Sequence, residues 1–362
     1  MSLLVGMVAD DLTGALDATA PFAQRGLRTT VIVSPEGLAG PLPADAEVLC
    51  INTASREVPE PEARRRMEAA MAALLPLAPA ILFKKIDSRL KGHVGIETQA
   101  MAQASGRGRV IAAPAIPDLG RLVYAGKLVG AGVLEPIPVA PRLLPLVAEV
   151  PEIPDQRALD AIGRAIVGEG SSCLAVGARG LAQAIAARLP ARAAPPAPRP
   201  LPRPCLIAIG SRDPITRAQV ERTLAALGPK HVRAPNGAVP PLTFGPGLTL
   251  VTTEPGTTTE AGTVVAARFA GGLAAAIAAQ PPAAMLISGG ETAYAVFARL
   301  GVSAVAVGGE AAPGTPFATT LIGDRQVIIL TKSGGFGPPD TISLLVRQPQ
   351  DLDLSLDSQA AS

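Results

Sequence analysis

Short apolar runs rich in β-branched residues recur along the chain, and most are followed by a stretch with helical patterning. In the first half these runs lie at residues 3–9, 29–34, 47–52, 80–86, 109–115 and 173–178. In the second half they lie at residues 205–210, 248–254, 283–289 and 326–332. Near-continuous apolar strands separated by helices are typical of parallel sheets covered on both faces. The sequence therefore predicts the α/β fold class, with three-layer domains and mostly parallel sheets.

A proline-rich stretch divides the chain, whose 362 residues exceed what one compact core usually holds. We expect an N-terminal domain at residues 1–190 and a semi-rigid linker at residues 191–204. A C-terminal domain then covers residues 205–346, and the polar residues 347–362 form a flexible tail. Gly-spaced short runs at residues 119–133 predict a β-hairpin excursion in the first domain.

Composition excludes several classes of protein. The net charge is +2, and the chain has no Trp, two Tyr and seven Phe, so neither a basic footprint nor a stacking platform for nucleic acid is indicated. No apolar run reaches the ~18 residues of a membrane span. Three isolated cysteines favour a reduced, cytoplasmic setting, and two histidines exclude a three-histidine metal site. The oligomeric state, including a homo-oligomer, stays open.

Charged loops follow three strands of the first half. They begin at Asp10-Asp11, at Thr53 and at Lys84. Ligands of open α/β sheets bind at the carboxyl ends of the strands. We therefore expect a site for a small polar anion there. Its carboxylate would be bound by the cations Arg56, Lys84, Lys85, Arg89 and Lys91. Its hydroxyls would donate hydrogen bonds to Asp10, Asp11 and Asp87, one of which would act as a general base. The alternatives are that an aspartate only caps a helix and that the lysines lie in a solvated loop.

Glycine-rich loops follow three strands of the second half, at residues 210–216, 288–292 and 331–337. Glycines before a helix let backbone N–H groups approach phosphate oxygens, and Lys332 adds a point charge. One such loop is an ordinary turn, but three in one domain favour a nucleotide site. A P-loop and a strand-linked G-x-G-x-x-G are both missing. An acid-sugar-like site joined to a phosphate site indicates phosphoryl transfer.

The motifs together resemble the four-carbon acid sugar kinases, which phosphorylate threonate, erythronate and related acids with ATP. In the first half the resemblance rests on A-D-D-x-T-G-A at Ala9 to Ala15, T-x-S-R at Thr53 to Arg56, a partial match at Lys84 to Glu97, and P-A-x-P-x-x-G-R at Pro114 to Arg121. In the second half it rests on Gly210 to Gln219, Gly289 to Thr292 and Lys332 to Gly337. The matches occur in order along nearly the whole chain, which makes the combination specific.

The resemblance implies an acid-sugar domain followed by a nucleotide domain, with the reaction in the cleft between them. It implies catalytic roles for Asp10, Asp11 and Lys85. It implies substrate contacts from Thr13, Arg56, Lys84, Asp87, Ser88 and Arg89. ATP would be bound by Ser211, Gly289, Gly290, Glu291, Thr292, Lys332, Gly334 and Gly335, with Mg²⁺ on its phosphates and no dedicated protein metal site.

The chain departs from the family pattern at Arg89, Lys91 and His93, where the family commonly has Thr, Arg and Asn. The choice among threonate, erythronate and 3-oxo-tetronate therefore stays open. Two other readings also stay open. One is a nucleotide-binding regulatory protein that has lost catalysis on the same scaffold. The other is a nicotinamide oxidoreductase, which lacks its dinucleotide fingerprint here.

Overall fold

The computed structural model describes residues 3–194, 196–197, 200–211, 213–335 and 337–348. The chain divides into two compact units. Unit 1 comprises residues 1–195 and 303–309, and unit 2 comprises residues 196–302 and 310–362. The first boundary falls inside the proline-rich stretch. Residues 303–309, which the sequence assigned to the second domain, belong to unit 1, and most of the predicted tail lies outside the described residues.

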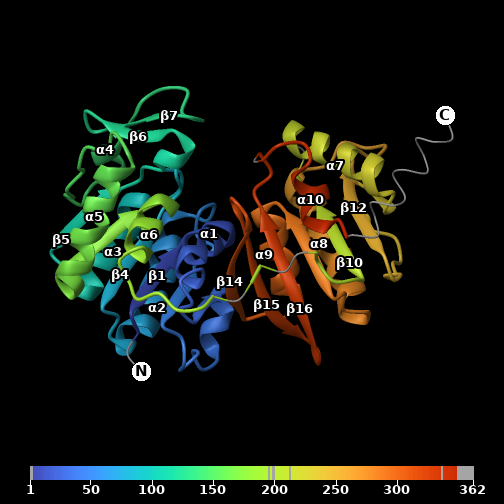
Figure 1. The fold of residues 1–362 in the computed structure, drawn as a ribbon, viewed down its shortest axis with the longest axis horizontal. Coiled ribbons are helices and arrows are strands. Elements are labelled where there is room, and N and C mark those ends of the chain that lie inside the picture. The colour runs from blue at the N-terminus through green and yellow to red at the C-terminus, as the bar shows by residue number, and fades with distance from the viewer. Residues whose placement is uncertain (1–2, 195, 198–199, 212, 336, 349–362) are drawn as a thin grey trace. The chain divides into compact units, whose positions relative to one another are not determined.

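The sheet of unit 1 is parallel except at one edge (Figure 1). Its strands are β1 (Val5–Ala9), β2 (Thr29–Ile32), β3 (Val48–Asn52), β4 (Ile81–Lys85), β5 (Arg109–Ala113) and β9 (Cys173–Gly177). They run in the order β2-β3-β1-β4-β9-β5. Residues 304–307 of β14 (Ala304–Ala312) pair antiparallel with β2 and cover its free edge. Every residue of β1, β3, β4 and β9 is buried, and their sequences are apolar apart from Asn52, Lys84 and Lys85 at the carboxyl ends of β3 and β4.

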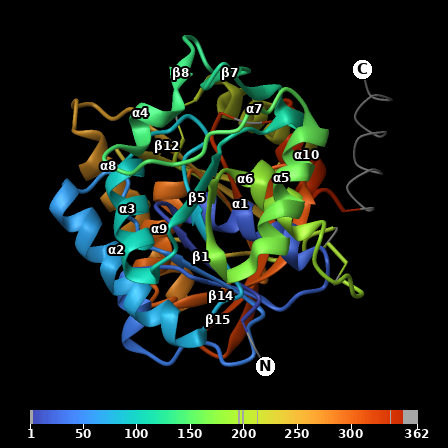
Figure 2. The ribbon, with the colours of Figure 1, turned by 90° about the vertical axis from the view of Figure 1, so that its left-hand side faces the viewer.

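Helices cover both faces of this sheet (Figure 2). They are α1 (Leu12–Ala23), α2 (Glu60–Leu74), α3 (Val94–Ser105), α5 (Gln156–Glu169) and α6 (Arg179–Ala186). The β1-α1-β2 and β3-α2-β4 connections cross the sheet in opposite directions, so right-handed crossovers place α1 and α2 on opposite faces. Helix α1 packs beside α6, α6 packs beside α5, and α2 packs beside α3.

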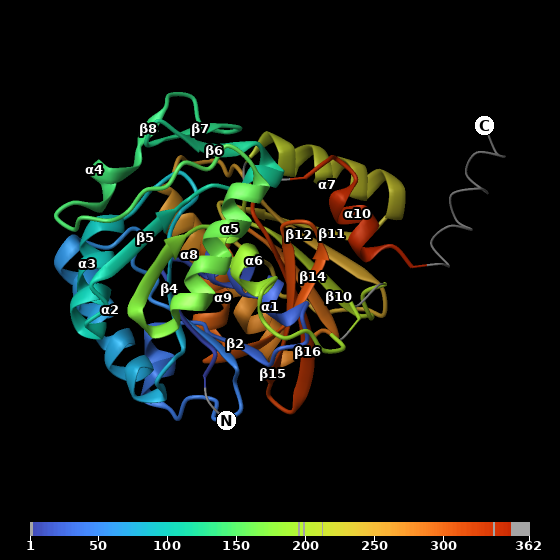
Figure 3. The same ribbon diagram turned by 60° about the vertical axis from the view of Figure 1, so that its left-hand side comes forward.

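The predicted hairpin excursion is confirmed. Strands β6 (Arg121–Tyr124), β7 (Lys127–Gly130) and β8 (Ile137–Pro138) form a separate antiparallel sheet that precedes α4 (Val139–Leu143). Figure 3 shows it as an excursion from the body of unit 1. A turn at Pro117–Leu119 connects β5 to this sheet, so the hairpin begins near the carboxyl end of β5.

Unit 2 repeats the architecture with a mixed sheet. Its strands run in the order β11 (Lys230–Pro235), β12 (Leu248–Glu254), β10 (Cys205–Ile209), β13 (Ala284–Ser288), β16 (Arg325–Lys332) and β15 (Thr315–Ile322). The first five are parallel and β15 is antiparallel to β16. Its helices pack in two pairs, α7 (Pro214–Leu227) with α10 (Thr341–Val346), and α8 (Gly262–Ala279) with α9 (Gly290–Arg299).

Helix α8 is apolar and long enough to cross a membrane by composition alone. In the structure it is a core helix of unit 2, because Val265, Phe269, Leu273 and Ile277 on one side of it are buried.

Candidate active site

Three carboxylates from three loops of unit 1 surround one guanidinium. Arg56, in the loop after β3, donates from Nε to Asp10 Oδ2 and from Nη2 to Asp10 Oδ1, both at 2.9 Å. Its Nη2 also donates to Asp11 Oδ1 at 2.7 Å. Asp87, in the loop after β4, lies 3.7 Å from Arg56 Nη1. The structure thus brings together the charged loops that the sequence identified, at the carboxyl end of the sheet.

The two adjacent aspartates have different surroundings. Asp10 is buried and both of its oxygens accept hydrogen bonds from Arg56. Asp11 caps α1 by accepting from Gly14 N at 3.1 Å, and its side chain is 25% exposed. Asp11 Oδ2 accepts no hydrogen bond from any residue that the structure describes. The predicted cap is therefore confirmed for Asp11, but one of its oxygens still faces an open position.

The pKa values of Asp10 and Asp11 are shifted in opposite directions. Burial alone would raise the pKa of Asp10, but the hydrogen bonds from Arg56 and the charge of Lys84 hold that pKa below its usual value. Burial raises the pKa of Asp11 more than the Arg56 charge lowers it, and the neighbouring Asp10 carboxylate adds to the rise. A carboxylate with a raised pKa is the better proton acceptor of the two.

The two lysines at the end of β4 point to different partners. Lys84 is fully buried and its Nζ lies 2.9 Å from Glu97 Oε2 on α3. The other oxygen of Glu97 accepts from Ser55, whose hydroxyl also pairs with Thr53. Lys84 is thus neutralised inside the protein by Glu97. Glu97 was not among the predicted site residues, although it is the last residue of the motif that begins at Lys84.

Lys85 lies at the amino end of α1. Its Nζ donates to Ile86 O at 2.9 Å, and a Cβ atom built on Gly14 would lie only 2.7 Å from it. Its charge is close enough to lower the pKa values of both Asp10 and Asp11. Thr13 lies in the same first turn of α1 and is partly exposed. Lys85 therefore adds a cation to the aspartate pair and the helix terminus.

The loop after β4 is fixed by hydrogen bonds within the loop and by one from the hairpin. Asp87 Oδ1 accepts from Arg89 N at 2.8 Å and from Lys91 N at 3.3 Å. Ser88 Oγ accepts from Arg121 Nη1 of β6 at 2.6 Å. Arg121 was noted in the sequence only as the end of a motif. His93 makes a hydrogen-bond contact with a neighbouring loop, because its Nε2 lies 2.6 Å from Val58 O.

The three glycine loops of unit 2 come together at the carboxyl ends of β10, β13 and β16. A Cβ atom on Gly210 would overlap the side chain of Thr292, and one on Gly334 would overlap Ser211 Oγ. Thr216, in the first turn of α7, donates its hydroxyl to Gly334 O. The glycines are needed because the loops approach one another without room for side chains.

This edge of unit 2 is suited to phosphate. Helix α7 begins after its cap Asp213, and α9 begins after Gly289, whose φ is +108°. Both amino termini follow the glycine loops, where exposed N–H groups favour an anion. Lys332 is buried and donates to Ser333 O at 2.7 Å, and burial lowers its pKa to about 8. Glu291 is exposed in the first turn of α9, and Phe336 lies outside the described residues.

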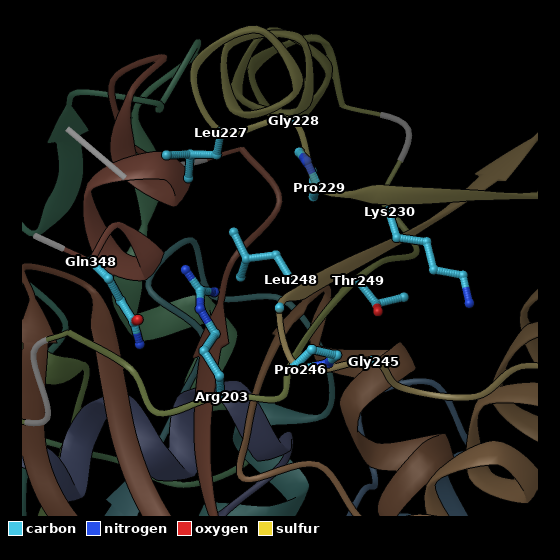
Figure 4. Close-up of a pocket in the computed structure, with 11 residues that line it drawn as sticks. Arg203, Leu227, Gly228, Pro229, Lys230, Gly245, Pro246, Leu248, Thr249 and Gln348 are labelled. Atoms are coloured by element: carbon cyan, nitrogen blue, oxygen red, sulfur yellow. The ribbon is translucent and has the colours of Figure 1, made fainter. Parts of the chain in front are cut away.

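A pocket of about 430 Å³ lies elsewhere in unit 2 (Figure 4). It is bounded by Arg203 and Leu248 at the amino ends of β10 and β12, and by Gly228 and Lys230 after α7. The glycine loops follow the opposite ends of the strands. This pocket therefore contributes no residue to the predicted nucleotide site.

Comparison with known proteins finds a matching family model in each half of the chain. The family described as a sugar-binding N-terminal domain matches residues 5–140, and the one described as a nucleotide-binding C-terminal domain matches residues 249–342. A D-threonate kinase from Bordetella bronchiseptica is 28% identical over 93% of this chain and 95% of its own length. A 3-oxo-tetronate kinase from Methylobacterium radiotolerans is 29% identical over 94% of this chain and 98% of its own length.

The chain belongs to the four-carbon acid sugar kinase family. A further member, a D-threonate kinase from Salmonella typhimurium, is 32% identical, but the match spans only 60% of each of the two chains. The crystal structure of Haemophilus influenzae protein HI1011 has the same fold, with a TM-score of 0.70 at 23% identity over 94% of this chain and 98% of that one. The fold class predicted from the sequence is confirmed.

Proposed function

We propose that this family member is an ATP-dependent phosphotransferase that phosphorylates the terminal hydroxyl of a four-carbon acid sugar. The observation that carries the proposal is the convergence of three glycine loops beside Lys332 at one edge of unit 2. It is supported by the Asp10–Asp11–Arg56 cluster at the corresponding edge of unit 1. Relatives that align along nearly the whole chain are named as kinases of threonate and 3-oxo-tetronate.

In this proposal unit 2 holds the phosphates of ATP. Backbone N–H groups of the Gly289–Gly290 and Gly334–Gly335 turns, with Ser211 and Thr292, bind phosphate oxygens. Lys332 supplies a positive charge that the phosphates draw toward its protonated form. The glycines at positions 210 and 334 let these loops approach one another closely, which gathers their backbone groups at one edge of the sheet.

A magnesium ion fits the same edge as part of the nucleotide. No cluster of three or more acidic, His or Cys residues that could hold a metal occurs among the described residues. Mg²⁺ bound to nucleotide phosphates needs only one or two protein carboxylates, and Asp213 is the carboxylate beside the Gly334–Gly335 turn. When bound, the ion supplies neutralisation of phosphate charge.

In unit 1 the proposed base is Asp11. Its second oxygen accepts the proton of the substrate hydroxyl while the hydroxyl oxygen attacks the γ-phosphorus, and the bond from that phosphorus to the β–γ bridging oxygen breaks to release ADP. Asp10 stays ionised and, through Arg56, holds the loops that form the site. Lys85 and the amino end of α1 stabilise negative charge on the transferring group.

The interdomain cleft and the cytoplasmic setting that the sequence indicated stay predictions. No finding favours the catalytically inactive alternative.

The experiment is ADP release from Mg-ATP with D-threonate, D-erythronate and 3-oxo-tetronates. We expect turnover with at least one acid, and loss of turnover in Asp11→Ala and Lys85→Ala. Arg164→Gln, at an exposed position of α5, is the control for expression and folding. ATP binding without turnover on any of these acids would refute the kinase assignment. Turnover that survives substitution of both Asp10 and Asp11 would remove the aspartates from the mechanism.

A further inference from the structure

The cations of unit 1 differ in whether a carboxylate already neutralises them. Arg56 is bound to Asp10 and Asp11 and lies near Asp87. Lys84 is bound to Glu97. These two residues were expected to receive the substrate carboxylate, but each already has anionic partners. A carboxylate ligand therefore needs other cations at this end of the sheet.

Arg121 is such a cation. It lies at the start of β6, is partly buried, and has only neutral oxygen partners. Its Nε and Nη2 donate to Ala131 O at 3.1 and 2.9 Å, and its Nη1 donates to Ser88 Oγ at 2.6 Å. Among the described residues no carboxylate lies within 4 Å of its nitrogens. These bonds fix the plane of the guanidinium without an ion pair, although the Asp87 carboxylate is near enough to act on its charge.

Arg89 strengthens this positive site. It is exposed on the loop after β4, directly after Ser88. Burial lowers the pKa of Arg121, and the charge of Arg89 lowers it further, against the opposing effect of the Asp87 carboxylate. Two like charges held near each other are unfavourable without a counter-ion, and a bound anion relieves both the repulsion and the burial. The carboxylate of Asp87 belongs to the same loop but is turned to Arg56 and to the loop's own N–H groups.

The site is next to the proposed catalytic cluster. Ser88, which Arg121 holds, follows Asp87 in the chain, and Asp87 lies 3.7 Å from Arg56. The aspartate pair requires a hydroxyl as its partner, and the arginines require an anion. An acid sugar carries these two groups at opposite ends.

We propose that Arg121, assisted by Arg89, binds the carboxylate of the acid substrate and so selects acids over neutral sugars. The inference rests on the proposed function and deepens it, since it fixes which end of the substrate lies at which end of the site. A planar guanidinium can bind a carboxylate with two parallel hydrogen bonds, and partial burial strengthens them. The hydroxyl at the other end of the chain then lies toward Asp11.

The test compares an acid with its neutral analogue. Wild type, Arg121→Gln, Arg121→Lys and Arg89→Thr are assayed with the best of the four-carbon acids and with its amide, in which the negative charge is removed. We expect Arg121→Gln to lower kcat/KM for the acid by about 10- to 100-fold, mostly through KM, because a charge-assisted contact is lost. The value for the amide should change less than about threefold. Arg121→Lys and Arg89→Thr should have intermediate effects on the acid alone.

One further measurement keeps the inference separable from the kinase assignment. The shift in melting temperature caused by the acid is measured without ATP, and it should be lost in Arg121→Gln but kept in Arg164→Gln. This readout works even if wild type turns over none of the acids, an outcome that refutes the kinase proposal only. Equal losses on acid and amide would show that Arg121 only supports the loop, and an unchanged KM for the acid would show that it makes no contact. Either result overturns the inference.

Discussion

The Lys84–Glu97 pair gives the sharpest prediction about what holds unit 1 together. The ammonium and carboxylate are 2.9 Å apart and their side chains are 0% and 1% exposed. Glu97→Gln retains the shape of the side chain and an oxygen for Ser55, but it leaves the charge of Lys84 buried without a counter-ion. Removing one partner of a buried ion pair typically costs about 3–5 kcal/mol.

For a unit of this size, 1 kcal/mol corresponds to roughly 2–4 °C in melting temperature, so we expect a decrease of about 6–20 °C. The measurement is scanning calorimetry, with hydrogen exchange in α3 and β4 to assign the transition to unit 1. The double variant Lys84→Met with Glu97→Gln should recover most of the loss, because the isolated charge is removed. A decrease below about 2 °C in Glu97→Gln, or additive losses in the double variant, would refute the reasoning.

Three other outcomes follow from the site. Gly334→Ala should raise KM for ATP by about 10-fold or more with KM for the acid unchanged, because its Cβ would overlap Ser211 Oγ; equal KM values for ATP would contradict this. Asp11→Asn should lower kcat by about 100-fold or more at a near wild-type melting temperature, and the acidic limb of the wild-type kcat profile should lie above the usual Asp range. Burial lowers the pKa of Lys332 to about 8, from 10.5 in the unfolded chain, so between these values the folded state binds fewer protons than the unfolded state. The free energy of unfolding should therefore rise from about pH 8 to 10. Thermal melts of Lys332→Met should show no such increase. ATP binding near pH 8.5 should take up protons, which calorimetry in buffers of different ionisation enthalpy detects.

The parts of the fold that were predictable are those with periodic signals of their own. Each buried parallel strand is a continuous apolar run, and helices such as residues 60–74 have clear amphipathic or charged patterns. The less regular elements were missed. Strand β11, whose residues are mostly exposed or partly exposed, has no apolar run, and β14 contains consecutive glycines. The pairing of β14 with β2 depends on the whole chain, so no local pattern indicates it.

The composition of the site was predictable because the carboxyl ends of parallel strands meet at one edge of a sheet. The sequence thus indicated that the loops at Asp10, Arg56 and Lys84 would come together. It could not indicate which cation each carboxylate neutralises. That choice depends on side-chain directions and on α3, which carries Glu97 beneath Lys84.

Charge pairing, more than charge content, decides what such a site can bind. A cation that already has a buried carboxylate partner gains little from a second anion and loses the free energy of its first contact. Lys84 and Arg56 already have such partners. Their role is to fix the loops at the strand ends and to keep Asp10 ionised. Arg121 is held only by neutral oxygens, so its charge remains for a ligand. For this reason the residue that determines recognition of the acid group is expected on the hairpin, outside the densest cluster of charges in the sequence.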